Sequence, residues 1–299
     1  MDPATIKKEN VKLIVSDVDG TLLDSAHEVP AKTRNAILAI RKSHPDLPFI
    51  IATGKPFAAT LDIRRDLNLT PFHCIHTNGC LIYGPNDAND GTTLDWAENL
   101  ETDFVRRVVR ENRKRQIGTF VYVTDEVFEV VLDARGRVGG PAREDGKGWL
   151  EILRAFGEDV KVPPEGFLER LESGDVKVQK MVLCVNDPEV PAFRQHLVTD
   201  YPATSFHLTQ ALTFALELLP LKASKQAALQ HICDELGITV DNVLAFGDGE
   251  NDAGMLGTVK YGVVMPNGME GAKKAAAYVA PVTNDEAAVG VVLDSIFGQ

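Results

Sequence analysis

The chain has 299 residues, of which 44% are hydrophobic and 25% charged, and its formal net charge is −12. This length suffices for one large α/β domain or two ordinary ones, and the composition is typical of a globular protein in water. The acidic excess argues against general binding to nucleic acids or anionic membranes, and no apolar run reaches the ~18–20 residues of a membrane span.

The ends of the chain and its cysteines indicate the compartment. The N-terminal 12 residues are polar and lack the apolar core of a signal peptide. The cysteines are scattered and form no CxxC pair; they are Cys74, Cys80, Cys184 and Cys233. We therefore predict a cytoplasmic protein in a reducing compartment, present as a monomer or weak homodimer.

Strand and helix signals alternate along the first part of the chain. They indicate a buried strand at 11–15, a helix at 30–43, a strand at 49–52, a helix at about 57–68 and a strand near 72–77. This order is typical of a parallel sheet with crossover helices.

From about residue 84 the pattern changes to that of an inserted α+β module. A polar, linker-like stretch at 84–91 leads to a basic helix, two strands, a Gly-rich loop at 134–148, two helices, a strand, a helix and a hairpin-like pair. A long insertion at a surface turn costs little in loop closure. We therefore predict a core domain made of residues 1–83 and 217–299, with a second domain at 84–216. The Gly-rich loop is either a plain connection or a substrate gate.

The alternation of strands and helices then resumes. A helix at 224–236 ends at Gly237, a suitable residue for the position after a helix. The remaining predicted elements are a strand at 242–246, a strand at 261–265, a short helix at 268–276, a strand at 278–280 and a helix at 284–297.

Unusual polar residues stand where these elements begin or end. They are Asp17 and Asp19, Thr53 with Lys55, Lys225, and Asp248 with Asn251 and Asp252. Ligands bind at the carboxyl ends of strands in open α/β sheets, so the strand-end residues can meet at one edge. The helix dipole does not favour a lysine in the first turn, which indicates an anion that Lys225 must face.

This set has the parts of a phosphoryl-transfer site. Carboxylates from two strands, Asp17 and Asp248, suit a hard cation such as Mg²⁺. One carboxylate can act as a covalent nucleophile and a second, such as Asp19, can donate a proton to the leaving oxygen. A hydroxyl, an amide and a lysine can share the charge on the phosphoryl oxygens.

Four motifs resemble those of the haloacid dehalogenase superfamily phosphatases. They are Asp17-x-Asp19-Gly20-Thr21, Thr53-Gly54, Lys225 and Gly247-Asp248-Gly249-Glu250-Asn251-Asp252. The insertion after Asn78-Gly79 resembles the Cof-like branch with a type IIB cap. The resemblance implies a Rossmann-like α/β core with an inserted α+β cap of the C2B type, which would select the substrate.

The resemblance also implies a role for each matching residue. Asp17 would be the nucleophile and a Mg²⁺ ligand, Asp19 the general acid/base with its carbonyl on the metal, and Asp248 the other metal ligand. The phosphoryl group would be bound by Thr53, Gly54, Lys225 and Asn251, while Asp252 would orient metal-bound water or Lys225. The family usually has arginine where this chain has Lys55, and lysine cannot make the planar bidentate grip of arginine.

Simpler interpretations exist for single motifs. In Asp17-x-Asp19-Gly20 the glycine comes too early for a calcium loop, and the entering helix of such a loop is missing. His73-Cys74-Ile75-His76 alternates along a strand, so at most two ligands for zinc converge and packing is the better interpretation. The arginine-rich segment 106–115 is either a solvated helix face or a nucleic-acid patch.

Three functional hypotheses follow. The first is a Mg²⁺-dependent phosphatase of small phosphorylated metabolites such as sugar phosphates, acting through an aspartyl-phosphate on Asp17. The second is a phosphosugar mutase of the same superfamily. The third is a non-catalytic protein that binds phosphorylated ligands, against which the complete set of acidic residues and Lys225 argues.

Overall fold

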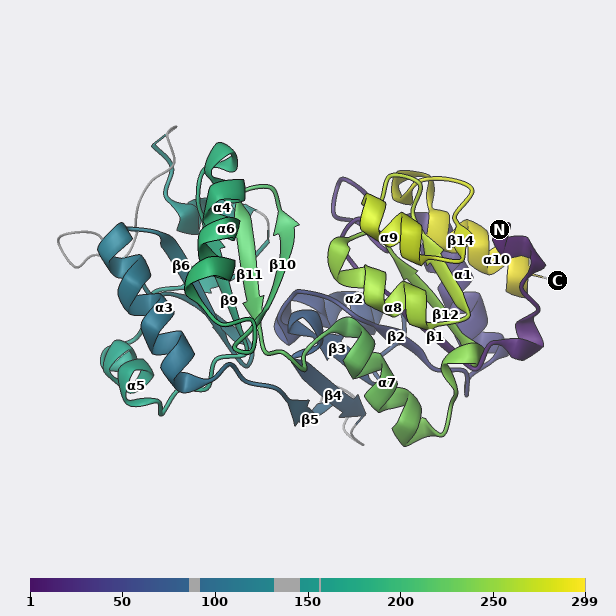
Figure 1. Ribbon diagram of the computed structural model, residues 1–299. Helices are drawn as coiled ribbons and strands as arrows, with labels where there is room; N and C mark the ends of the chain where they lie inside the picture. The colour runs from purple at the N-terminus through teal and green to yellow at the C-terminus, as the bar shows by residue number, and fades with distance from the viewer. Residues whose placement is uncertain (86–91, 132–145, 156, 299) are drawn as a thin grey trace. The chain divides into compact units, whose positions relative to one another are not determined.

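A computed structural model describes residues 1–85, 92–131, 146–155 and 157–298 (Figure 1). The chain forms two compact units. The first consists of residues 1–54, 60–96 and 224–299, and the second of residues 55–59 and 97–223.

The first unit is built on a five-stranded parallel sheet with strand order β14-β13-β12-β1-β2. Its strands are β1 (Leu13–Ser16), β2 (Phe49–Ile51), β12 (Val243–Gly247), β13 (Tyr261–Val264) and β14 (Tyr278–Val279). Its helices are α1 (Ala31–Ser43), α2 (Leu61–Asp66), α7 (Lys225–Leu236), α8 (Ala253–Thr258), α9 (Glu270–Ala275) and α10 (Ala288–Phe297). This confirms the predicted parallel α/β core.

Helices on both sides explain why β1 is apolar from Leu13 to Val15. Leu13 and Val15 pack against Ala228 and Ile232 of α7 in one buried cluster. A second helical layer contains α1 and α10, which approach so closely that a Cβ at Gly290 would lie 2.7 Å from the backbone of Thr33. A strand covered on both faces favours apolar side chains, and its one polar residue, Ser16, stands at its end.

A small three-stranded sheet, with order β3-β4-β5, completes the first unit. It contains β3 (Cys74–His76), β4 (Leu81–Pro85) and β5 (Thr92–Ala97), and β3 is antiparallel to β4. One parallel bridge between Ala52 and Ile75 links β3 to the end of β2. Asn78 and Gly79 both have a positive φ in the turn between β3 and β4.

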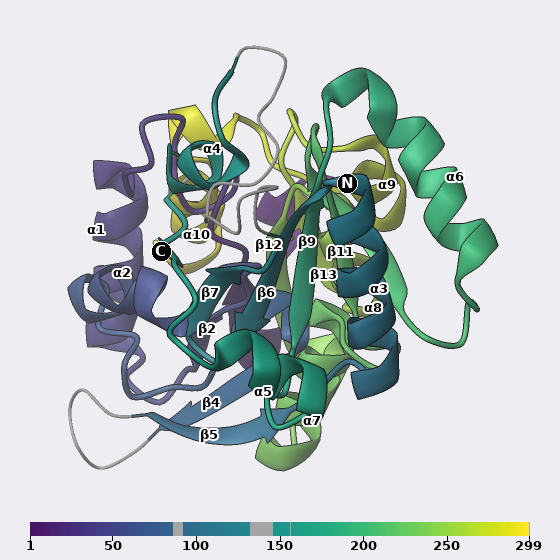
Figure 2. The ribbon, with the colours of Figure 1, turned by 90° about the vertical axis from the view of Figure 1, so that its left-hand side faces the viewer.

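The second unit contains a six-stranded sheet with order β10-β11-β9-β6-β7-β8. Its strands are β6 (Gly118–Val123), β7 (Glu126–Glu129), β8 (Val160–Lys161), β9 (Lys180–Cys184), β10 (His207–Leu212) and β11 (Ala215–Leu219). Its helices are α3 (Thr102–Arg115), α4 (Trp149–Ala155), α5 (Phe167–Ser173) and α6 (Val190–Asp200). Side chains of α3, α5 and α6 cover one face of the sheet, and α4 packs on the other (Figure 2).

The boundaries differ from those expected from the sequence. The main segment of the second unit spans residues 97–223, where the sequence suggested 84–216, and residues 55–59 belong to this unit as well. The reason is strand pairing: β4 and β5 extend the sheet begun by β3, whereas β11 pairs with β9. The predicted helix at 57–68 is a 3-10 turn at Phe57–Thr60 followed by the shorter α2. Residues 86–91 and 132–145, which hold most of the predicted linker and Gly-rich loop, lie outside the described residues.

The basic helix α3 has a buried apolar face and an exposed charged face. Phe104, Val105, Val108 and Val109 are buried. Its arginines pair with acidic side chains, including Arg107 with Glu111 at 3.1 Å and Arg110 with Glu172 at 2.8 Å. This arrangement supports the solvated-face interpretation over a nucleic-acid patch. None of the described helices combines the length and the apolar character needed to cross a membrane.

Candidate active site

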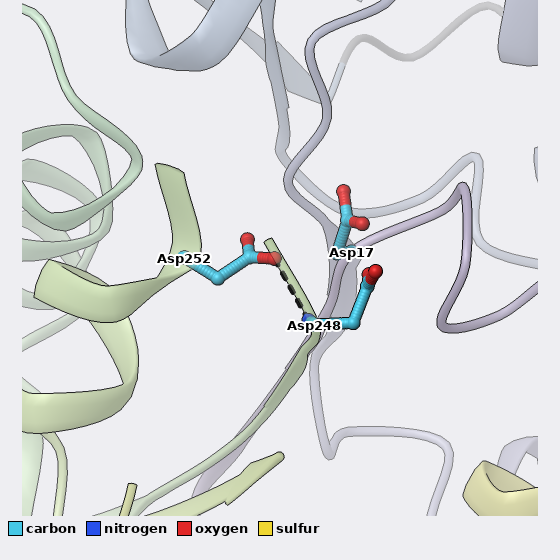
Figure 3. A group of neighbouring side chains, drawn as sticks. All are labelled: Asp17, Asp248 and Asp252. Atoms are coloured by element: carbon cyan, nitrogen blue, oxygen red, sulfur yellow. Dashed lines mark hydrogen bonds between the residues drawn. The ribbon is translucent and has the colours of Figure 1, made fainter. Parts of the chain in front are cut away.

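The carboxylates of Asp17 and Asp248 come from the ends of adjacent strands. Ser16 of β1 pairs in register with Phe246 of β12, and the Asp17 N–H donates to the Phe246 carbonyl at 3.0 Å. Each aspartate is the first residue after its strand, so both side chains emerge at the carboxyl edge of the parallel sheet (Figure 3). This is the meeting of strand ends that the sequence predicts.

Lys225 lies between two of the acidic side chains. Its Nζ donates to Asp17 Oδ1 at 2.5 Å and to Asp252 Oδ1 at 2.7 Å, and the residue is only 1% exposed. Ser224 caps the helix that carries it, since its Oγ accepts from the Ala227 N–H at 3.0 Å. The sequence predicts an anion facing Lys225, and the structure shows two, the carboxylates of Asp17 and Asp252.

Gly79 allows the start of α7 to reach this position. Gly79 has φ +91°, and a Cβ built there would lie 2.2 Å from the carbonyl oxygen of Ser224. Only glycine combines that backbone angle with so close an approach. The sequence marked Asn78-Gly79 as a turn, but nothing in it indicated that the turn supports Lys225.

Asp252 shapes the loop that carries Asp248. Its Oδ2 accepts from the backbone N–H groups of Asp248 and Gly249, both at 2.9 Å (Figure 3 shows the first). A Cβ at Gly247 would lie 2.6 Å from the Asp252 side chain, so glycine is required there for space. Asp252 therefore orients both Lys225 and the loop.

Thr21 and Gly20 fix the carboxylate of Asp248 from the other side. Thr21 Oγ1 donates to Asp248 Oδ1 at 2.8 Å. Gly20 has φ +73°, and a Cβ there would lie 2.6 Å from Asp248 Oδ2. Both residues belong to the motif that begins at Asp17, but the sequence alone does not show that they contact Asp248. Their position directly after Asp19 was the available signal.

The three aspartates carry more negative charge than Lys225 neutralises. Asp17, Asp248 and Asp252 have carboxylate oxygens that all lie within 4.8 Å of one another. Burial raises the pKa of Asp17 well above its usual range against the opposing effect of Lys225, and Asp252 and Asp248 raise it further. Burial and then Asp252 raise the pKa of Asp248 to about 6. Burial lowers the pKa of Lys225, but Asp17 and Asp252 outweigh it and raise it.

This donor set fits a divalent cation. Buried carboxylate oxygens in excess over the available ammonium groups are what a hard, oxygen-liganded cation requires. Among the described residues, these aspartates form the one group of histidine, cysteine and acidic side chains close enough together to hold a metal ion.

Asn78 connects two of the predicted phosphate-binding segments. Asn251 Nδ2 donates to Asn78 Oδ1 at 2.9 Å, and a Cβ at Gly54 would lie 2.9 Å from the same oxygen. The Asn78 N–H donates to the Thr53 carbonyl at 2.9 Å. The sequence predicts only a turn at Asn78, because the residues that Asn78 contacts are distant from it in the sequence.

Asp19 and Lys55 differ from the other predicted residues. The Asp19 side chain is 44% exposed, and one of its oxygens lies 3.9 Å from His27 Nδ1. Lys55 belongs to the second unit, where its ammonium acts on the carboxyl group of Glu158. The structure therefore groups Lys55 apart from Asp17, Asp248 and Lys225.

The alternative metal interpretations find no support in the described residues. His73 Nε2 lies 3.1 Å from Glu235 Oε1, and the rings of His76 and Tyr83 pack edge to face. Asp17 follows a strand and not the entering helix of a calcium loop. All four cysteines are buried and form no disulfide.

Comparison with known proteins gives a consistent result. The sequence profile of the haloacid dehalogenase-like hydrolases matches residues 14–293. An uncharacterized hydrolase of Schizosaccharomyces pombe is 36% identical over 97% of this chain and 91% of its own length. The 5-amino-6-(5-phospho-D-ribitylamino)uracil phosphatase of Bacillus subtilis is 25% identical over 95% of this chain and 97% of its own length.

Solved structures share the fold over nearly the whole chain. A haloacid dehalogenase-like hydrolase from Bacteroides thetaiotaomicron has a TM-score of 0.76 and 23% identity, covering 96% of this chain and 100% of its own. A subclass IIB sugar phosphatase of the same superfamily has a TM-score of 0.75 and 20% identity, covering 95% and 98%.

Proposed function

Because this chain belongs to the family of haloacid dehalogenase-like hydrolases, we propose that it is a Mg²⁺-dependent phosphatase acting through an aspartyl-phosphate on Asp17. One observation carries the proposal. Asp17 stands buried at the carboxyl edge of the sheet, held by Lys225 at 2.5 Å beside the carboxylate of Asp248. A buried carboxylate in this setting is oriented for attack and needs an electropositive reaction partner.

The reaction divides into two displacements at phosphorus. In the first, an oxygen of Asp17 bonds to phosphorus while the ester bond breaks, and Asp19 gives a proton to the leaving alcohol oxygen. In the second, water attacks phosphorus and loses its proton to Asp19, which releases phosphate and restores Asp17. Asp19 suits this role because its side chain is 44% exposed and can meet both the leaving group and water.

The remaining residues bind and orient the phosphoryl group. Lys225, the hydroxyl of Thr53, the amide of Gly54 and the side chain of Asn251 supply positive charge and donors for its oxygens. Asp252 holds Lys225 in place. Mg²⁺, held by the side chains of Asp17 and Asp248 and the carbonyl of Asp19, would neutralise charge on the carboxylates and the transferred group.

The substrates are small phosphate monoesters, sugar phosphates or related metabolites. The phosphatase of Bacillus subtilis named above acts on a phosphorylated ribityl compound, which supports this class. In this proposal the first unit is the catalytic core and the second selects the substrate. The protein would work in the cytoplasm as a monomer or weak homodimer, without nucleic-acid or membrane partners.

The test is hydrolysis of p-nitrophenyl phosphate with and without Mg²⁺. We expect activity only with the metal, and its loss in Asp17→Asn, which keeps the shape of the side chain and removes the nucleophile. Asp62→Asn is the matched control, since the Asp62 side chain is fully exposed. Activity surviving in Asp17→Asn would overturn the nucleophile assignment. Conversion of glucose 1-phosphate to the 6-phosphate without release of phosphate would indicate a mutase instead.

A further inference from the structure

The turn between β3 and β4 has an unfavourable backbone conformation. Its three residues, Thr77, Asn78 and Gly79, have positive φ angles of 53°, 58° and 91°. Asparagine and glycine adopt this region readily, but a β-branched residue such as Thr77 rarely does. The Thr77 hydroxyl is fully buried and has no hydrogen-bond partner among the described residues, so it does not compensate for the strain. Such strain persists where the surrounding structure imposes it, often at functional sites, and it calls for a functional explanation.

The turn fixes the side chain of Asn78 within the first unit. The Asn78 N–H donates to the Thr53 carbonyl at 2.9 Å, and the residue is only 1% exposed. Its side-chain oxygen Oδ1 lies against Gly54, where a Cβ would come within 2.9 Å of it. The backbone conformation and the packing together therefore determine where this oxygen points.

The same oxygen determines how the amide of Asn251 is turned. Asn78 Oδ1 accepts a hydrogen bond from Asn251 Nδ2 at 2.9 Å, and among the described residues this is the only hydrogen bond of the Asn251 side chain. Asn251 Oδ1 is turned toward Gly249, where a Cβ would lie 2.5 Å from it. The Asn251 amide thus donates one N–H to Asn78, and its second N–H is not used within the described part of the chain.

The orientation of this amide decides whether it can bind a phosphoryl group. A side-chain amide donates through its nitrogen and accepts through its oxygen, and rotation about the last side-chain bond exchanges the two ends. The oxygens of a phosphate ester accept hydrogen bonds. With its nitrogen beside Asn78, Asn251 keeps one N–H for such an oxygen. After a half-turn, two carbonyl oxygens would face each other and no hydrogen bond could form between them.

We propose, on the basis of the phosphatase function above, that Asn78 is a positioning residue for phosphoryl transfer. Its side-chain oxygen holds the nitrogen end of the Asn251 amide, so that the second N–H of Asn251 Nδ2 is directed to a phosphoryl oxygen of the substrate. Asn78 acts through Asn251 and does not itself touch the substrate. The turn at residues 77–79 serves to present this oxygen, which accounts for the strain at Thr77.

The first test removes the oxygen and keeps the backbone angle. Glycine accepts a left-handed φ, so Asn78→Gly frees the Asn251 amide to rotate. We expect kcat/KM for p-nitrophenyl phosphate to fall about tenfold, with a matching rise in the inhibition constant of inorganic phosphate, since a hydrogen bond to a charged group has an effect of about this size. The Mg²⁺ concentration for half-maximal activity should stay unchanged, because Asn78 has no part in holding the metal in this proposal.

The control for this variant is Asn68→Gly, since Asn68 also has a positive φ, at 55°, but is exposed. It should leave both constants unchanged. An unchanged kcat/KM in Asn78→Gly would overturn the proposal. A shift in its Mg²⁺ requirement as large as the fall in kcat/KM would show a general structural role and overturn it as well.

The second test asks whether Asn78 acts through Asn251. In the Asn251→Ala background, Asn78→Gly should lower kcat/KM by less than about twofold, because the amide that Asn78 orients is already absent. A fall of about tenfold in both backgrounds would show that Asn78 acts independently of Asn251, and this would overturn the proposal.

The third test observes the amide in the unaltered protein. Proton–nitrogen NMR in the presence of Mg²⁺ resolves the two hydrogens on Asn251 Nδ2, which are identified by their absence in Asn251→Ala. Inorganic phosphate, at concentrations that inhibit hydrolysis, should shift one of these two signals far more than the other, because Asn78 already binds one hydrogen. Equal shifts, or none, would overturn the proposal. Failure of the wild type to hydrolyse p-nitrophenyl phosphate with Mg²⁺ would instead overturn the proposed function itself.

Discussion

Each unit of this protein buries a lysine next to carboxylates, and the two lysines differ in their surroundings. Lys225 lies between Asp17 and Asp252 at 2.5 and 2.7 Å, with Asp248 in the same group. Lys180 donates to Glu217 at 3.1 Å, lies over the ring of Tyr122 and also acts on the carboxyl group of Glu158. At the first site, three carboxylates lie close enough together to hold a hard cation. In the second unit, the charged groups are spread along one face of a sheet. The difference teaches that a buried lysine beside carboxylates suits a divalent cation only where the carboxylate oxygens also lie close to one another.

The sharpest way to break this comparison is to remove each lysine charge in turn. Lys225→Met leaves two buried carboxylates unpaired and deprives the phosphoryl group of a cation, so we expect kcat for p-nitrophenyl phosphate to fall on the order of 10³-fold. Lys180→Met, in the second unit, should change kcat for p-nitrophenyl phosphate far less. Steady-state kinetics at saturating Mg²⁺ measure both. A fall in kcat of similar size in the two variants would contradict the division of roles.

The support of Lys225 by Gly79 gives the next largest effect. Gly79→Ala places a Cβ 2.2 Å from the Ser224 carbonyl oxygen at φ +91°. We expect a loss of about 2–4 kcal/mol in the free energy of unfolding, together with reduced activity, because α7 must shift. Gly166→Ala in the second unit is the matched control. It has φ +76° but open space, so strain alone should cost about 1 kcal/mol. Urea unfolding of both variants measures the difference, and equal losses would show that the close approach to Ser224 is unimportant.

The raised pKa of Asp248 makes the stability of the metal-free protein depend on pH. This carboxyl has a pKa of about 6 in the folded state against an ordinary 3.8, so folding favours its protonated form. The resulting penalty is absent below pH 3.8, grows as the pH rises toward 6, and is complete above it, amounting to about 3 kcal/mol at most. Chelator-treated wild type should therefore lose stability over this range relative to Asp248→Asn. Parallel pH profiles of the two proteins in thermal unfolding would contradict the assignment.

The same pKa predicts how Mg²⁺ binding responds to pH. The metal needs the ionised form of Asp248, so below about pH 6 its affinity should fall by up to about tenfold per pH unit for each proton displaced. Titration calorimetry with Mg²⁺ between pH 5 and 7.5 measures this affinity. A higher Mg²⁺ concentration should shift the loss of phosphatase activity on the acidic side to lower pH. The second unit contributes none of this dependence in the proposal, so Glu217→Gln should leave the pH profile of Mg²⁺ affinity unchanged. A shift of the pH profile of Mg²⁺ affinity in Glu217→Gln would contradict the assignment of this pH dependence to Asp248.

Much of the first unit could be predicted from the sequence. The apolar run Leu13–Val15, which precedes Ser16 and Asp17, is explained by burial on both faces, and the local sequence pattern shows it. The same holds for α7, whose cap Ser224 and terminal Gly237 lie where the sequence indicated. Such signals survive in the sequence because they depend on residues within a few positions of each other.

Local sequence patterns could not predict the contacts that build the site. Asn78 bridges Gly54 and Asn251, and Gly79 receives Ser224, across separations that no periodicity records. The unit boundary at residue 97 depended on the pairing of β4 with β5, a choice between strands that many sequences would allow. The acidic motif was visible, but the partners that position it were not.

The second unit shows the limit most clearly. Thr209, Glu217, Lys180 and Tyr122 come from four strands, and each alone is an ordinary strand residue. The sequence by itself determined that strands alternate with helices and which carboxylates follow the strands. It could do so because local propensity and the pattern of burial depend on neighbouring residues. Only the tertiary structure decided which side chains share a face, because strand order and register join residues that are distant in the chain.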